Sequence, residues 1–264
     1  MNIQPESSAL VDVRNGAVWI TLNRPQALNS ITPDIVTAVN AALDRAEADD
    51  IKAVVLTGSG RAFCAGADLK FVRGATGEGE DAFVPFLDSV FRMMERIEKF
   101  PRPVIAAING ITVAGGLELV LCCDLVIAAR SARIGDGHIN YGLLPGGGGS
   151  VRLPRKIGPT RAKYLLFTGE SVPAEDLVAA GLVNEVVDDE DLLPAAGRLV
   201  AKLSDKSPLA LRRVKSLVDD GMEQTIPTAL RLELLATEVH AHSHDMNEGL
   251  AAFGEKRKPN FTGR

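Results

Sequence analysis

Glu118 is a charged residue in an otherwise apolar stretch of the chain, "GGLELVLCC" (residues 115–123). The glycine pair that opens this stretch, Gly115 and Gly116, stands at the expected start of a buried helix. A carboxylate in the first turn would complement the positive end of the helix dipole, which is one interpretation of Glu118. An ionisable group among apolar neighbours is rarely buried without a reason, so a catalytic role is the second interpretation.

Two loops place small residues directly after apolar strands, "AFCAGADLK" (62–70) and "NGITVAGG" (109–116). Small residues allow a ligand to approach backbone N–H groups closely. The second loop also leads into a helix N-terminus, which favours developing negative charge. We therefore expect one amide from each loop to form an oxyanion hole, where a single donor contributes about 2.7–4 kcal/mol to lowering a reaction barrier.

His138 is separated from the other three histidines, which cluster near the C-terminus, and it precedes the glycine run of "LLPGGGGS". An imidazole with an ordinary pKa near ~6.5 can donate or accept a proton close to neutral pH. The alternative is a loop histidine hydrogen-bonded to backbone, with no part in chemistry.

Three other motifs predict no site. "GSGRAF" (58–63) begins like a dinucleotide fingerprint, but Phe63 stands where a small residue is needed, so we expect a tight turn. "PGGGGS" lacks the Lys-Ser/Thr of a phosphate-binding loop. "HAHSHD" would place His240 and His244 on one helix face, yet it lacks the HExxH pattern and no cluster of cysteines or carboxylates accompanies it, so we expect a solvated helix end and no metal.

The elements around these residues alternate between strands and helices, which predicts an α/β fold. Thr32 and Pro33 are typical of the N-cap and first position of a helix, and Pro85 is expected in the first turn of another. A polar loop is expected at 74–81. The predicted strands are 17–22, 53–58, 103–110 and 125–129, and the predicted helices are 32–50, 82–100 and 115–124.

The strand pattern ends before about Ser207, after which only helices are expected. We therefore predict two regions, an α/β core at 1–203 and a helical region at 204–264. The length of 264 residues is sufficient for a sizeable core.

Composition limits the possible partners and compartment. A net charge of −5 argues against nucleic acid as the main partner. We expect no membrane span, because apolar runs are too short, and no signal peptide in the first residues. Cys122 and Cys123 are adjacent and Cys64 is isolated, so we expect no disulfides and a cytoplasmic location.

Taken in order, six segments resemble the enoyl-CoA hydratase/isomerase (crotonase) family. They are "ITLNRPQALNSI", "GSGRAFCAGADL", "NGITVAGGLELVLCCDLVIAA", "GLLPGGGGSVRLPRKIG", "AGLVNEVV" and "FGEKRKPNF". The resemblance runs from about residue 10 to 262 and implies a spiral of ββα units that binds acyl-CoA. It also implies that the helical C-terminal region forms homotrimers or dimers of trimers; with the charge and the short apolar runs, we expect no nucleic-acid or membrane partner.

The resemblance further implies roles for individual residues. The two oxyanion donors fall on the amides of Ala67 and Gly115, and the first of two family glutamates, which activates water, falls on Glu118. CoA would contact Arg24, Ala27, Ala65, Asp68 and Leu69, with Lys256 and Arg257 as phosphate contacts from a neighbouring subunit. The alternative for Lys256 and Arg257 is a solvated basic tail. No cofactor is implied, because CoA is part of the substrate.

The chain departs from the family at the second glutamate, whose position His138 occupies. We expect an enoyl-CoA hydratase in which Glu118 is the base for water and His138 handles the α-proton. The alternatives are an isomerase or a C–C or thioester hydrolase of the same fold, and a non-catalytic acyl-CoA-binding subunit.

Overall fold

The computed structural model describes residues 7–48, 51–75 and 82–264. The last residues of the predicted helix 32–50 and most of the predicted loop 74–81 lie outside this part of the chain. The same holds for residues 1–6, where no signal peptide was expected.

Two β-sheets form the frame of the core. The larger sheet has the order β1-β2-β3-β5-β7-β10 and is parallel except for β1, which pairs antiparallel with β2. The smaller sheet has the order β4-β6-β8-β9, with β9 antiparallel to β8. The strands of the larger sheet are β1 Ala9–Arg14, β2 Ala17–Leu22, β3 Ala53–Gly58, β5 Val104–Ile108, β7 Leu125–Ala129 and β10 Glu185–Val187, and those of the smaller are β4 Ala62–Cys64, β6 Ile111–Val113, β8 Arg133–Gly135 and β9 Ser171–Pro173.

Successive pairs of strands divide themselves between the two sheets. In the pairs β3–β4, β5–β6 and β7–β8, the first strand joins the larger sheet and the second joins the smaller one. Helices follow each pair, so the expected α/β fold of repeated ββα units is confirmed. The helices concerned are α2 Leu69–Ala75 and α3 Phe83–Glu98 after the first pair, α4 Gly115–Leu121 after the second, and the 3-10 helix η2 His138–Tyr141 with α5 Gly149–Ile157 after the third.

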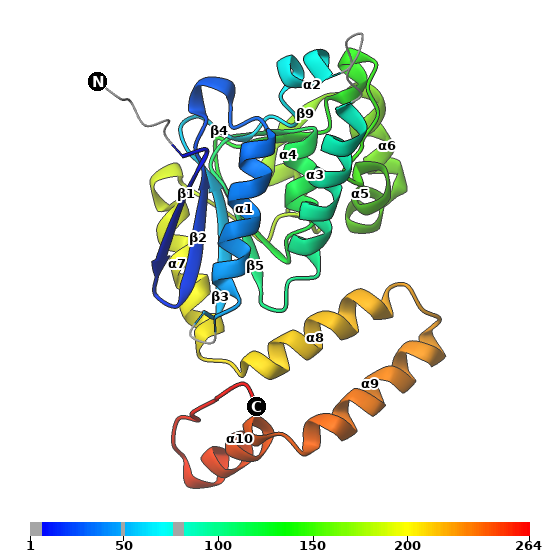
Figure 1. The fold of residues 1–264 in the computed structure, drawn as a ribbon. Coiled ribbons are helices and arrows are strands. Elements are labelled where there is room, and N and C mark those ends of the chain that lie inside the picture. The colour runs from blue at the N-terminus through cyan, green and yellow to red at the C-terminus, as the bar shows by residue number, and fades with distance from the viewer. Residues whose placement is uncertain (1–6, 49–50, 76–81) are drawn as a thin grey trace, which may run out of the picture.

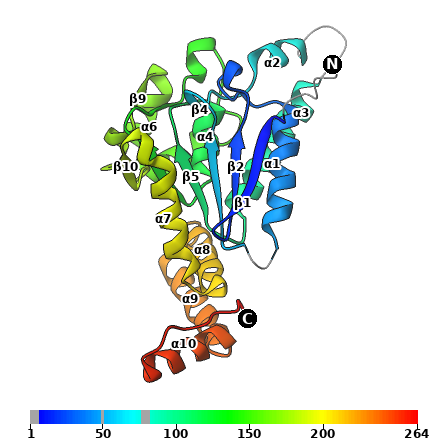
Figure 2. The same cartoon turned by 90° about the vertical axis from the view of Figure 1, so that its left-hand side faces the viewer.

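Alternating side chains of the larger sheet enter two separate cores. Val18 and Ile20 of β2 pack in the core that includes α1 and α3, while Ala17 and Trp19 face the core under α7. The sheet is thus covered on both faces (Figures 1 and 2), as expected for parallel strands. The remaining helices of this region are α1 Pro33–Ala46, α6 Pro159–Thr168 and α7 Leu192–Ser204, with the 3-10 helices η1 Pro25–Ala27, η3 Ala174–Leu177 and η4 Asp189–Asp191.

Helix α1 begins at the predicted residue, but the described residues do not form the capping hydrogen bond expected from the Thr32 side chain. Thr32 is the N-cap residue and Pro33 the first helical residue, yet the Thr32 hydroxyl is buried and has no hydrogen-bond partner in the described residues. Pro33, whose fixed φ suits the first turn, is therefore the signal that defines this boundary. Pro85 lies in the first turn of α3, as predicted.

The strand β1 was not predicted, although the sequence signals it. Asn15 and Gly16 link β1 to β2, and both have left-handed backbone angles, with φ of 53° and 74°. An Asn-Gly pair between two strands is the preferred sequence for a two-residue hairpin turn.

Three helices extend from the core at one end (Figures 1 and 2): α8 Pro208–Gly221, α9 Ile226–Ala241 and α10 His244–Glu255. The prediction of helices alone after about Ser207 is confirmed, while the boundary between 203 and 204 stays a prediction. An ion pair of 2.9 Å between Lys215 on α8 and Asp124 in the core links the two regions. Within the described part of the chain, α9 buries none of its residues.

Cysteine and membrane predictions can be compared with the described residues. Cys64, Cys122 and Cys123 are all described, free and buried. Burial raises the pKa of the Cys64 and Cys122 thiols to about 12, so both are protonated at neutral pH. Among the helices in the described ranges, none has the length and apolarity needed to cross a bilayer.

Candidate active site

Glu118 is buried in the first turn of α4, with 3% of its surface exposed. Its Oε1 atom accepts hydrogen bonds from the amides of Gly147 and Gly149, at 2.7 and 2.8 Å. A Cβ atom at Gly147 would lie 2.8 Å from Oε2 of the same carboxylate. The glycine run therefore encloses Glu118 closely and orients its carboxylate through backbone N–H donors. A glutamate that only complemented the helix dipole would not need such donors.

The pKa of Glu118 is raised above its ordinary value. Burial is the main cause, and the negative charge of Asp136 adds to it. The amides of Gly149 and Gly147 and the charge of His138 oppose the rise. A carboxylate with a raised pKa is a stronger base than a solvated one, as proton abstraction near neutral pH requires.

His138 is the first residue of η2, and its side chain is 12% exposed. Its Nδ1 atom lies 2.9 Å from Oδ2 of Asp136, whose Oδ1 accepts the His138 backbone N–H at 3.1 Å. Among the described residues, the partner of the ring is thus a carboxylate and not a backbone group. Burial lowers the pKa of His138, but the hydrogen bond and charge of Asp136, together with the charge of Glu118, outweigh burial and raise it.

Asp136 is a site residue that the sequence analysis missed. It is only 1% exposed and both of its oxygens contact His138. The available signal was the spacing Asp-x-His, because an aspartate can fold back on groups two residues further along the chain. The structure thus adds the carboxylate of Asp136 to the predicted pair of Glu118 and His138.

The two predicted oxyanion donors lie on adjacent segments. Ile31 forms a parallel bridge to Ala67 through the Gly66 carbonyl and the Asp68 amide, which turns the Ala67 amide away from Ile31. A Cβ atom at Gly115 would lie 3.5 Å from the Ala67 nitrogen, so the two amides are close. Within the described residues, neither amide donates a hydrogen bond to the protein.

The backbone is strained beside these donors. Ala114, the N-cap of α4, has φ 52° and ψ −123°, and its amide donates to the Gly135 carbonyl at 3.3 Å. Such a conformation costs a non-glycine residue on the order of 1–3 kcal/mol, and it persists only where the surroundings hold it. The ψ angle of Ala114 sets the direction of the Gly115 amide, because that amide belongs to the peptide group that follows Ala114.

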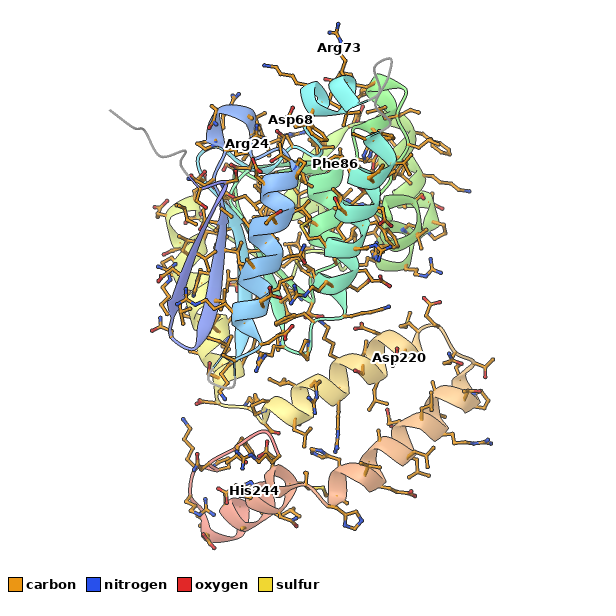
Figure 3. The ribbon with its side chains drawn as sticks, in the orientation of Figure 1. Arg24, Asp68, Arg73, Phe86, Asp220 and His244 are labelled. Atoms are coloured by element: carbon orange, nitrogen blue, oxygen red, sulfur yellow. The ribbon has the colours of Figure 1, made fainter. Side chains whose placement is uncertain are left out.

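The residues expected to contact CoA in the core are near one another. The Arg24 guanidinium donates to Oδ2 of Asp68 at 3.0 Å and to the Ser30 carbonyl at 2.8 Å. Figure 3 shows Arg24 and Asp68 together at the end of the sheet that is far from α10. Ala27 lies in η1, the Ala65 amide donates to Leu28, and Leu69 is 44% exposed at the start of α2.

Lys256 and Arg257 are not brought to this site within one chain. They follow α10 at the opposite end of the molecule (Figure 1). Arg257 is ion-paired with Glu248 and Glu255, both at 2.6 Å, and Lys256 is exposed. Their predicted contact with phosphate therefore depends on a neighbouring subunit and stays a prediction.

The C-terminal histidines do not share one helix face, contrary to the spacing argument. His240 belongs to α9 and lies 2.7 Å from Arg213, whereas His244 begins α10 and lies 3.2 Å from the Thr262 hydroxyl. Throughout the described ranges, no group of three or more His, Cys, Asp and Glu side chains could hold a metal ion. The predicted turn at 58–63 is observed between β3 and β4.

Comparisons with known proteins give matches over nearly the whole chain. Residues 12–264 match the family model described as Enoyl-CoA hydratase/isomerase. The chain is 38% identical to a crotonyl-CoA hydratase of Syntrophomonas wolfei over 242 residues, which is 91% of this chain and 92% of the relative. It is 36% identical to a short-chain-enoyl-CoA hydratase of Clostridium acetobutylicum over 254 residues, which is 96% of each chain.

A crystal structure of an enoyl-CoA hydratase from Bacillus anthracis superposes with a TM-score of 0.92 at 38% identity, covering 97% of this chain and all of that one. Family model, relatives and structural neighbour all extend over nearly the whole length. The chain belongs to the enoyl-CoA hydratase/isomerase (crotonase) family.

Proposed function

We propose that the protein is an enoyl-CoA hydratase, a lyase that adds water to a 2-enoyl-CoA or removes it from a 3-hydroxyacyl-CoA. The observation that carries the proposal is the buried Glu118 carboxylate, which two glycine amides hold. It lies in the same helical turn as Gly115, whose amide is close to that of Ala67. Two relatives are named as hydratases of crotonyl-CoA and short-chain enoyl-CoA, which supports the same reaction.

In the proposed mechanism, the amides of Ala67 and Gly115 bind the thioester oxygen and stabilise the enolate. Glu118 takes a proton from water while the hydroxyl bonds to the β-carbon. His138 then gives a proton to the α-carbon, which leaves the imidazole neutral and Glu118 protonated. A proton returns from Glu118 to His138 before the next cycle. The thioester itself takes up the electron pair, so these steps need no metal or redox cofactor.

CoA binding and assembly complete the proposal. The adenine and pantetheine would follow Arg24, Ala27, Ala65, Asp68 and Leu69, and Lys256 and Arg257 of a second subunit would contact phosphate. Exposed apolar side chains on α9 support a homotrimer or a dimer of trimers, among them Ile226, Leu230, Leu234 and Val239. The three thiols, all free and buried, fit a reducing compartment such as the cytoplasm.

The resemblance places His138 where the family has its second glutamate, and two other functions within the family would follow from that difference. The Asp136–His138 pair could serve double-bond isomerisation, or it could activate water for attack on a carbonyl, as in a C–C or thioester hydrolase. The alternative in which the protein is not an enzyme is a non-catalytic acyl-CoA-binding subunit.

Incubation with crotonyl-CoA separates these functions. A hydratase removes the absorbance of the conjugated enoyl thioester and forms 3-hydroxybutyryl-CoA, and Glu118→Gln should largely abolish this. Formation of free CoA would indicate a thioester hydrolase instead, and a shifted double bond would indicate an isomerase. CoA binding without turnover would refute catalysis.

A further inference from the structure

Asp136 makes two contacts with one residue. Its Oδ1 accepts the backbone N–H of His138 at 3.1 Å, and its Oδ2 lies 2.9 Å from the ring nitrogen Nδ1. Asp136 is 1% exposed, so little water competes for either oxygen. It stands directly after β8, and Gly137, with φ 73°, allows the chain to turn so that His138 folds back on it.

These contacts determine where the imidazole carries its protons. An ionised carboxylate only accepts hydrogen bonds, so the ring nitrogen beside it must bear a hydrogen. In the neutral ring, Nδ1 is then the protonated nitrogen and Nε2 has the free electron pair.

We propose that Asp136 is a positioning residue that keeps a hydrogen on Nδ1 of His138, so that Nε2 is the atom that exchanges the α-proton. The inference rests on the proposed function. In hydration, the imidazolium gives its Nε2 proton to the enolate α-carbon and becomes neutral with Nδ1–H retained. In dehydration, the free pair of Nε2 takes the same proton back.

Among the described residues, two carboxylates act on the charge of the His138 ring: Asp136 from its own segment and Glu118 from α4. Burial of the ring favours the neutral form, and both carboxylates favour the imidazolium. Asp136 is the stronger of the two, because it also accepts the hydrogen bond from Nδ1. Its removal should therefore affect both the tautomer and the charge of the ring.

The substitution Asp136→Asn tests this with little change in volume. The amide oxygen can still accept the backbone N–H of His138, which places the amide NH₂ beside Nδ1. An NH₂ group donates, so Nδ1 must lose its hydrogen and the neutral ring must carry it on Nε2. The ring then has no free pair at Nε2, and its protonated form is destabilised.

The first measurement is ¹⁵N NMR of the histidine rings across pH, with full-length wild type, D136N and H138A, the last to assign His138. We expect Nδ1–H in neutral wild type and Nε2–H, with a lower pKa, in D136N. His240, His242 and His244 are internal controls that should not change. An unchanged tautomer and pKa for His138 in folded D136N would refute the inference.

The second measurement is a double-mutant cycle on crotonyl-CoA hydration. We expect D136N to lower kcat by about 10–100-fold with little change in KM, as removal of an orienting partner commonly does. In the H138A background, D136N should have almost no further effect, because Asp136 acts through the missing ring. An equal loss in both backgrounds would mean a structural role and would overturn the proposal.

The two measurements also separate this inference from the proposed function. If wild type does not hydrate crotonyl-CoA, the proposed function fails, and NMR still decides whether Asp136 controls the tautomer. If wild type is active and D136N keeps the wild-type tautomer, the inference alone fails.

Discussion

Gly147→Ala should impair catalysis by moving the carboxylate of Glu118. The added Cβ would lie 2.8 Å from Oε2, about 0.6 Å closer than the 3.4 Å at which ordinary contact begins. The added Cβ would also collide with the thioether of Met94, a fully buried side chain that must shift as well. Glu118 has less freedom, because its Oε1 is bound to the amides of Gly147 and Gly149.

The size of the effect follows from this displacement. A misplacement of about 1 Å can cost 10²-fold in rate, so a shift of about 0.6 Å should lower kcat by about 10–100-fold. Crowding should also reduce the free energy of unfolding by about 1–3 kcal/mol. Hydration of crotonyl-CoA gives kcat, and thermal unfolding shows whether the variant is folded at the assay temperature.

Two matched variants make the result specific. Gly149→Ala places a Cβ 3.3 Å from Oε1, a milder conflict that should cost less activity than Gly147→Ala. Gly197→Ala lies in α7 with nothing within 4 Å of the added atom, and it should leave kcat unchanged. A folded Gly147→Ala enzyme with a kcat within twofold of wild type would refute this account of the glycine run.

Four further predictions concern the site and the assembly. Glu118→Gln should lower kcat by about 10²–10⁴-fold with CoA binding retained, and a change in stability alone would favour the helix-dipole role. Gly115→Pro, which removes one amide donor at a helix position that tolerates proline, should lower kcat by about 10²–10³-fold, and full activity in a folded variant would exclude that donor. In wild type, kcat for hydration should rise with pH as Glu118 ionises, at a pH above the ordinary pKa of a glutamate, and fall as His138 loses its proton, at a pH above the ordinary pKa of a histidine. The falling part of this profile should be absent in His138→Ala. His138→Glu should recover the hydration activity that His138→Ala loses. Light scattering should give a trimer or a multiple of one, and an active monomer would contradict this.

The strands predicted most accurately are three central strands of the larger sheet. The predicted bounds 17–22, 53–58 and 125–129 match β2, β3 and β7, because strands buried on both faces form apolar runs that end at turn residues. The strands of the smaller sheet have three residues each, too few to show a period. Their pairing is decided by contacts far along the chain.

The sequence singles out a candidate site residue where one side chain conflicts with its surroundings. Glu118 was visible as the lone charge in an apolar helix. Asp136 was not, since its role depends on a turn that brings His138 back to it. The glycine run is plain in the sequence, but the sequence does not reveal that Gly147 and Gly149 donate to Glu118. Such donors depend on backbone direction, which the side-chain pattern does not encode.

The division of the site among consecutive ββα units has a consequence for folding. Ala67 follows the first pair of strands, Glu118 follows the second and His138 follows the third. The amides that hold Glu118 lie 29 and 31 residues beyond it. During synthesis from the N-terminus, Glu118 therefore lacks the two hydrogen bonds that hold its carboxylate until the third unit has packed against the second. During refolding, enzymatic activity should consequently appear later than secondary structure, because the catalytic groups reach their final positions only when the third ββα unit has packed.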